Sequence, residues 1–82
     1  MAILRMQAVK AETGHKSHAS IYTAIRAGLF VKPVLIGQRA VGFPDYEVKA
    51  LISARIAGQT EAEIRELVKR LHAKRIELVQ AW

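Results

Sequence analysis

The sequence predicts a mainly α-helical fold that contains one small β-hairpin and ends in a long helix. Three observations lead to this prediction. Apolar residues recur at helical spacing before residue 30 and after residue 44. Between those limits they alternate at period two. A glycine follows directly after each of the first three predicted helices. A chain of 82 residues can build one small core and is too short for two.

The first predicted helix covers residues 5–13. Its apolar positions are Met6, Val9 and Ala11, which recur at helical spacing. Gly14 follows directly, and glycine is the residue best suited to end a helix in the left-handed conformation. We therefore expect a short helix that stops at this glycine.

The second predicted helix begins after a connection of only a few residues. Ser17 is the expected N-cap, and Gly28 is placed to close the helix. Ile21, Ala24 and Ile25 share one face, which we expect to be buried. Two short helices joined in this way form a helix-turn-helix, in which the second helix presents its outer face to DNA.

A β-hairpin is predicted after the second helix. The pattern there changes to period two, and Gly37-Gln38 interrupts it in the middle, which is typical of a turn between two strands. Pro33 suits the first residue of an edge strand. A hairpin directly after a helix-turn-helix makes the fold class a winged helix-turn-helix. The alternating residues are Val34, Ile36, Arg39, Val41 and Phe43.

A third helix is predicted from about Pro44 to Ala57. Proline is favoured in the first turn of a helix, and Asp45 and Glu47 are expected near its positive end. Gly58 is expected to end it. The residues expected on its buried face are Val48, Leu51, Ile52 and Ile56.

The last predicted helix starts at a capping box formed by Thr60 and Glu63 and extends to about Ala81. We therefore divide the chain into a winged helix-turn-helix DNA-binding domain, residues 1–58, and a C-terminal amphipathic helix, residues 59–82. That helix either packs on the domain or mediates oligomerisation. Its apolar stripe comprises Ile64, Leu67, Val68, Leu71 and Leu78, widened by Ile76 and Val79.

The charge is positive and unevenly distributed. Thirteen Lys and Arg stand against seven Asp and Glu, for a net charge of +6. Residues 1–57 hold eight basic and three acidic side chains, a balance of +5, whereas residues 58–82 hold five and four, a balance of +1. A polyanionic partner is therefore expected to bind the first two thirds of the chain.

Several classes of function are not expected. The chain has no Cys, which excludes disulfides and thiolate metal sites. His15 and His18 lack a third ligand nearby, so no metal site is expected. No nucleophile-plus-base spacing or phosphate-binding glycine loop occurs, so we expect neither an enzyme nor a cofactor. No apolar run has the length of a signal peptide or membrane span, and we expect a cytoplasmic protein with no membrane partner.

The outer face of the second helix alternates small residues with hydrogen-bond donors. Ser and Thr hydroxyls can reach base edges, Arg can pair with guanine or phosphate, and a helix N-terminus attracts phosphate. The alternative is an ordinary solvated face on which Ser and Thr act as caps. The candidate DNA contacts on this helix and the preceding turn are Lys16, Ser17, His18, Ser20, Tyr22, Thr23 and Arg26.

The hairpin supplies a second group of candidates. Gln38 and Arg39 lie at its tip, where the planar guanidinium suits a phosphate contact. Lys32 lies at its base, as a phosphate contact or as a plain surface charge. For Arg39 the alternative is a turn residue that serves solubility.

The chain contains, in this order, the segments ETG (12–14), SIYTAIRAGLF (20–30), KPVLIGQRAVGF (32–43) and EV (47–48). Together these segments resemble the AlpA family of small phage and prophage transcriptional regulators, which is similar to the excisionases and to the DNA-binding heads of MerR-type proteins. The matching run extends from Met6 to Arg55. The resemblance implies that the second helix enters the major groove and that Arg39 falls on the wing arginine. It also implies that Ser20 and Tyr22 are the recurring hydroxyl and tyrosine of that helix.

The residues and the resemblance together predict a sequence-specific DNA-binding transcriptional regulator of a phage, prophage or integrative element. It could also act as an excisionase, that is, as a recombination directionality factor. The expected partner is double-stranded DNA, bound by a homo-oligomer or cooperative assembly because one small module buries little surface. A contact with integrase or RNA polymerase would fall on the last helix. The alternative is a protein-interaction module, either an antitoxin or an integrase-docking adaptor, that works through residues 60–82.

Overall fold

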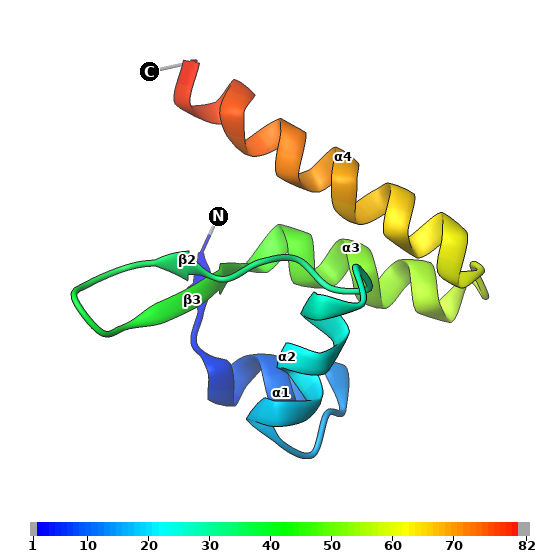
Figure 1. The fold of residues 1–82 in the computed structure, drawn as a ribbon, viewed down its shortest axis with the longest axis horizontal. Helices are drawn as coiled ribbons and strands as arrows, with labels where there is room; N and C mark the ends of the chain where they lie inside the picture. The colour runs from blue at the N-terminus through cyan, green and yellow to red at the C-terminus, as the bar shows by residue number, and fades with distance from the viewer. Residues whose placement is uncertain (1, 81–82) are drawn as a thin grey trace.

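The computed structural model describes residues 2–80, which form four helices and one small antiparallel sheet (Figure 1). The predicted fold class, a mainly α winged helix-turn-helix with a long C-terminal helix, is confirmed. In Figure 1 the hairpin projects to the left, α1 and α2 lie below α3, and α4 crosses above α3, with which it is in contact. The elements are β1 (Ile3–Leu4), α1 (Met6–Thr13), α2 (His18–Arg26), β2 (Val34–Leu35), β3 (Val41–Pro44), α3 (Asp45–Ile56) and α4 (Glu61–Gln80).

The first two helices begin and end where local sequence signals place them. Gly14 has φ 78° and donates its N–H to Lys10 O, so it ends α1 in the left-handed conformation. Ser17 is the N-cap of α2, and its Oγ accepts from Ser20 N–H at 3.1 Å. Gly28, also with φ 78°, follows the end of α2. Of the three apolar positions of α1, Met6 and Val9 are buried and Ala11 is exposed.

The sheet contains a strand that the sequence pattern did not predict. β3 lies between β1 and β2 and pairs antiparallel with both, with Leu4 opposite Phe43 and Leu35 opposite Val41. A Cβ on Gly42 would collide with the Ile3 side chain, so glycine allows β1 to approach β3 closely.

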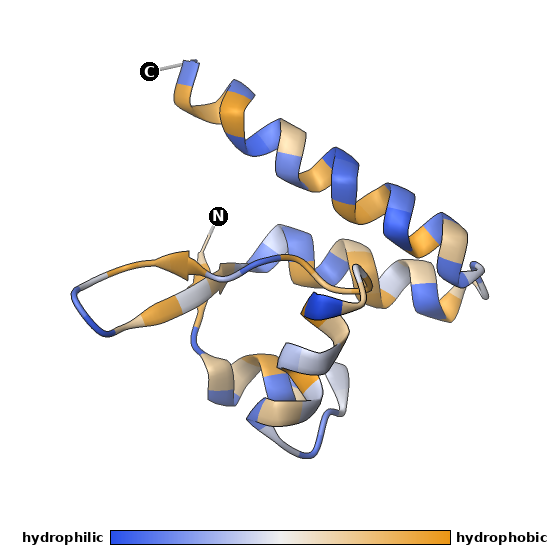
Figure 2. Ribbon diagram, in the orientation of Figure 1, coloured by the Kyte–Doolittle hydropathy of each residue, from blue (hydrophilic) through white to orange (hydrophobic). Residues whose placement is uncertain are grey.

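The strands of the hairpin are shorter than the alternating pattern suggested. Ile36 N–H donates to Ala40 O at 3.0 Å and closes the hairpin, and residues 37–39 form its tip. Gln38 and Arg39 therefore lie in the tip, where the sequence pattern placed them. In Figure 2 this tip is hydrophilic, whereas β2 is strongly hydrophobic.

One core joins the winged part to α4. Phe43 is its largest fully buried side chain, and its ring packs edge-to-face with Phe30 at a centroid distance of 5.4 Å. Three α4 side chains, Ile64, Val68 and Leu71, belong to this same cluster. The other buried apolar residues are Met6, Val9, Ile21, Val31, Val48, Leu51 and Ala54.

α3 packs differently from the prediction at both of its ends. Ile56, expected on the buried face, is 82% exposed, and Ala54 takes the buried position in the last turn. Glu47, expected at the positive end of the helix, is fully buried. A buried carboxylate needs a charged partner, and that partner comes from α4.

α4 begins at the predicted capping box. Thr60 N–H donates to Glu63 Oε1 at 3.0 Å, and Glu63 N–H donates to Thr60 Oγ1 at 3.2 Å. Towards its other end Ile76 and Val79 are 63% and 72% exposed, so the predicted wider apolar face is not buried there. The predicted end at Ala81 lies outside the described residues. None of the helices in the described part of the chain has the length and apolarity needed to cross a bilayer.

Candidate nucleic-acid interface

The outer face of α2 is exposed because Ile21 fixes the opposite face in the core. Thr23 and Arg26 both lie on the exposed side. Thr23 Oγ1 donates to Ala19 O at 2.9 Å and accepts from Arg26 Nη2 at 3.4 Å. The Arg26 guanidinium keeps further N–H donors for an external acceptor, since this weak bond uses one of them.

The start of α2 presents a cation, a hydroxyl and unpaired backbone donors. Lys16 and His18 are exposed on either side of the cap residue. The Ser17 hydroxyl accepts the capping bond from Ser20 N–H and can still donate its own proton. The helix N-terminus itself favours a phosphate at this place.

Ser20 is more constrained than the sequence suggested. It is half-buried, and its Oγ forms a 2.6 Å hydrogen bond with His15 Nδ1. His15 in turn packs edge-on against Phe30, with ring centroids 6.5 Å apart. Ser20 therefore links the turn to the core, and its capacity for a base contact is reduced.

The tip of the wing shares a concave surface with α2. Gln38 and Arg39 are both exposed there. Arg39 lines a hollow of about 450 Å³ together with His18 and Tyr22 of α2. The fold thus brings the wing arginine and one flank of the helix to a single surface. We call this hollow the wing hollow; among the described residues it is lined by Arg5, Met6, Gln7, His18, Tyr22, Arg39 and Val41.

Two polar residues of the wing hollow were not among the candidates. Arg5 and Gln7 come from the start of α1 and are both exposed. In the sequence, only the basic side chain of Arg5, just before the first helix, indicated a contact with DNA. Its position opposite the wing depends on the pairing of β1 with β3, which no local pattern indicated. They add a cation and an amide to the surface around Arg39.

The family comparison covers this surface. Residues 2–56 match the family described as prophage CP4-57 regulatory protein (AlpA). The chain belongs to the AlpA family. No curated protein and no solved structure matched it. The AlpA match includes α1, α2, the wing and α3, hence every candidate residue, and it stops before α4. AlpA membership places the chain in a family of phage regulatory proteins.

Lys32 is separated from the wing hollow in this AlpA-family chain. Its side chain is exposed beside a smaller hollow of about 210 Å³, where Arg65, Lys69 and His72 of α4 also lie. The backbone N–H of Lys32 donates to His72 Nε2 at 3.1 Å. The residue is therefore tied to α4, while the other candidates surround α2 and the wing tip.

The two histidines near the turn show no metal geometry. His15 is hydrogen-bonded to Ser20 and packs edge-on against Phe30, whereas His18 lines the wing hollow. Within residues 2–80 no three side chains of the ligating types gather closely enough to hold a metal ion. Both histidines are better understood through their contacts with the turn and the hollow.

Proposed function

We propose that this protein is a sequence-specific DNA-binding regulator that acts on transcription of a phage, prophage or integrative element, or on its excision. The observation that carries the proposal is the wing hollow, because it places Arg39 of the wing beside Tyr22 and His18 of α2. The convex face of α2 matches the shape of a duplex groove, and Arg39 on the same side of the molecule matches the position of the adjacent backbone. The positive balance of residues 1–57 supports the same partner.

In this proposal α2 enters the major groove. Thr23 and Arg26 contact base edges, and the small side chain of Ala19, one turn before Thr23, allows close approach. Lys16, Ser17 and His18 bind the phosphates that flank the groove at the start of the helix. Ser20 serves mainly to fix the turn through His15.

The wing and the hollow bind the backbone. Arg39 and Gln38 contact the sugar–phosphate backbone beside the groove. The Tyr22 hydroxyl donates a hydrogen bond to a phosphate oxygen. Arg5 extends this phosphate contact from the other rim of the hollow. Lys32 makes at most an outlying phosphate contact, because it lies beside α4.

The test begins with a target sequence selected from random duplexes and measured by fluorescence anisotropy. Thr23→Ala and Arg26→Ala should alter the preference at particular base pairs, by about 1–3 kcal/mol where a bidentate contact is lost. Arg39→Ala should weaken binding to all sequences about equally. Arg70→Ala is the matched control, since it removes the same charge from an exposed position on α4. Equal loss across all sequences for Thr23, Arg26 and Arg39 would contradict the proposed reading face.

Salt dependence tests the phosphate contacts separately. The logarithm of the affinity should fall linearly with the logarithm of salt concentration, with a slope of about −0.9 for each phosphate neutralised. Arg39→Ala should make this slope shallower by about one, whereas Arg70→Ala should leave it unchanged. Affinity that barely changes between about 50 and 200 mM salt would contradict the mechanism.

A second function is favoured by one observation, the exposed apolar end of α4. Ile76 and Val79 face solvent there and offer a surface for a second copy, an integrase or RNA polymerase. Ile76→Glu combined with Val79→Glu should abolish any cooperative assembly and leave binding of one copy to a half-site intact. If wild-type protein binds no DNA and these changes abolish binding to another protein, the chain is an interaction module of the antitoxin or adaptor type.

A further inference from the structure

Residues 27–33 join α2 to the wing, and three of their backbone groups form hydrogen bonds with side chains of α4. A polar backbone group without a partner costs free energy, so each such segment needs acceptors and donors from somewhere. Three side chains of α4 supply them at the two ends of this connection. We call Arg65, His72 and Arg75 the α4 brace.

The first end of the connection is the C-terminus of α2. Arg65 Nε donates to the carbonyl of Ala27, the C-cap residue, at 2.9 Å. Carbonyl groups at a helix C-terminus have no partner within the helix, and the helix dipole favours a cation there. The stem of Arg65 also lies against Gly28, with Cγ 3.6 Å from where a Cβ on that glycine would stand. α4 is thus bound directly to the end of the proposed recognition helix.

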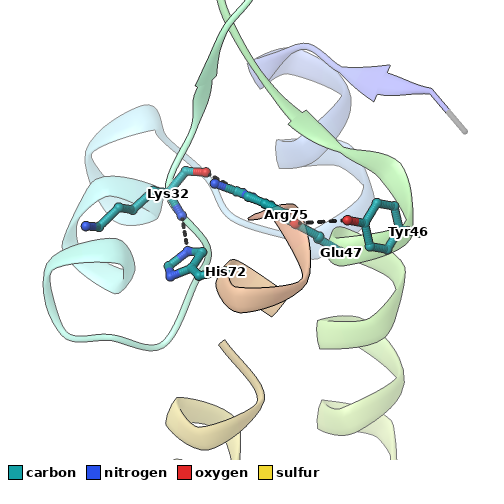
Figure 3. A network of polar contacts seen from close by, with 5 residues as sticks. All are labelled: Lys32, Tyr46, Glu47, His72 and Arg75. Atoms are coloured by element: carbon teal, nitrogen blue, oxygen red, sulfur yellow. Dashed lines mark hydrogen bonds and ion pairs between the residues drawn. The ribbon is translucent and has the colours of Figure 1, made fainter. Parts of the chain in front are cut away.

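The second end lies just before the wing. Lys32 N–H donates to His72 Nε2 at 3.1 Å, and Lys32 O accepts from Arg75 Nη2 at 2.8 Å (Figure 3). β2 begins only at Val34, so neither group belongs to the strand ladder. Both polar groups of one residue at the base of the wing are therefore held by α4.

Arg75 is itself fixed from inside the fold. Its Nε donates to Glu47 Oε2 at 2.8 Å, and Nη2 also donates to the same carboxylate. Glu47 is fully buried at the start of α3, and the Tyr46 hydroxyl donates to it at 3.4 Å. In Figure 3 the guanidinium lies between the Lys32 carbonyl and this carboxylate. The brace is therefore anchored in the core.

We propose that the α4 brace fixes the orientation of the wing relative to α2 and so positions both for DNA without touching DNA itself. A rise of about 1.5 Å per residue puts Arg65 and Arg75 about 15 Å apart on one rigid helix. That helix spans the connection and holds each end. Binding then carries a smaller ordering cost, because the two contacting elements are already in place. The DNA-binding part of this inference rests on the proposed function, whereas the orientation of the wing by α4 does not.

The main test replaces His72, which has no part in the proposed DNA contacts. His72→Phe keeps a flat ring and removes the acceptor for Lys32 N–H, and it should weaken DNA binding about fivefold. His72→Gln restores an acceptor on the side chain and should return the affinity to within about twofold of wild type. In an Arg39→Ala background, His72→Phe should change the affinity by less than about twofold, since the wing contact is already lost.

A control separates positioning from general stability. Thr60→Ala removes the cap of α4 and lowers stability without touching the connection. It should leave the DNA affinity within about twofold of wild type at a temperature where both proteins are folded. Equal weakening by Thr60→Ala and His72→Phe, or a full His72→Phe effect in the Arg39→Ala background, would overturn the proposal.

A second readout needs no DNA. Hydrogen exchange of the Ile36 amide, which closes the hairpin on Ala40, should accelerate about fivefold in His72→Phe. Exchange at Val68, in the middle of α4, should stay unchanged. If the wild-type chain binds no DNA but the Ile36 amide responds, the proposed function fails and the brace stands. An unchanged Ile36 amide overturns the brace even where DNA binding is intact.

Discussion

Glu47 shows how one residue can decide what a helix does. It lies two residues after Asp45 in the first turn of α3, where exposed acidic side chains usually interact favourably with the helix dipole. Here the side chain is fully buried and forms a bidentate pair with Arg75, whose side chain is 23% exposed. Burial and the nearby Glu47 carboxylate raise the pKa of Tyr46, which donates to the same group. A polar network therefore lies where the sequence suggested only an acidic residue at the positive end of a helix.

Removing Arg75 should be far more costly than removing the pair. Arg75→Met leaves the buried Glu47 carboxylate unpaired and should lower the free energy of unfolding by about 3 kcal/mol. The double variant Glu47→Met with Arg75→Met replaces both charges with apolar groups and should recover most of that loss. Urea unfolding of wild type, the single variants Arg75→Met and Glu47→Met, and the double variant measures this cycle. Additive losses in the double variant would show that the two side chains do not depend on each other.

His72 should make stability depend on pH. Burial, together with the nearby Arg75 and then Lys32, holds the pKa of His72 below its ordinary value of 6.5, against the opposing effect of Glu47. The folded state therefore takes up the proton less readily than the unfolded state does. Stability is fully present above about pH 6.5 and falls as the pH drops through that value towards the lower pKa of the folded state.

The measurement is urea unfolding at several pH values between about 8 and 5. His72→Gln, which cannot take up this proton, should lose less stability over the acid part of that range than wild type. The Lys32 N–H also loses its acceptor when the ring is protonated, so both effects act in the same direction. An identical acid decline in both proteins would assign the pH dependence to other groups.

At the scale of elements, local signals predicted what local chemistry determines. Ser17, Gly14 and the capping box at Thr60 have the roles expected of them, because each depends on residues within one turn. β1 was missed, since two residues carry no period and their pairing is set by a distant strand. The prediction that Ile56 is buried was wrong for a related reason. Periodicity predicts which residues share a helix face, but not how far along the helix the neighbouring elements cover that face.

β1 depends on the absence of a side chain at Gly42. Gly42→Ala would push a methyl group into Ile3 and close to Leu4 O at 3.1 Å, and should cost about 1–3 kcal/mol by separating β1 from β3. Ile3→Ala in the same chain removes the colliding Cγ2 and should restore part of that loss. Thermal unfolding of both single variants and the double variant measures this. Gly42→Ala with wild-type stability would show that β1 moves aside without cost.

At the scale of the molecule, the sequence predicted the parts of the candidate site better than their arrangement. The outward position of Thr23 and Arg26 follows from helical period once Ile21 is assigned to the core. The wing hollow does not follow from helical period, because Arg5 lies beside it only when β1 pairs with β3. Lys32 is the opposite case, since its basic side chain suggested DNA while its backbone is held by α4. Contacts between residues this far apart have no local signature.

α4 should therefore be required for the winged part to fold. A chain ending at Gly58 loses Ile64, Val68 and Leu71 from the core, each worth about 1.5–3 kcal/mol when buried. It also leaves Glu47 buried without its cation. Together these losses approach the total of about 5–15 kcal/mol that stabilises a small domain.

The truncated chain should show a weak, broad thermal transition by circular dichroism, in place of the cooperative unfolding of residues 1–82. Supplying α4 as a separate peptide should restore cooperativity in a concentration-dependent way, because the helix then binds as a ligand of the folded state. Thr60→Ala in the full chain is the comparison, since it weakens α4 by only about 1 kcal/mol and should keep a sharp transition. A truncated chain that melts sharply at nearly the wild-type temperature would mean that residues 2–58 fold without α4. The buried Glu47 would then have to reach water or another partner, which its exposed fraction in that fragment would reveal.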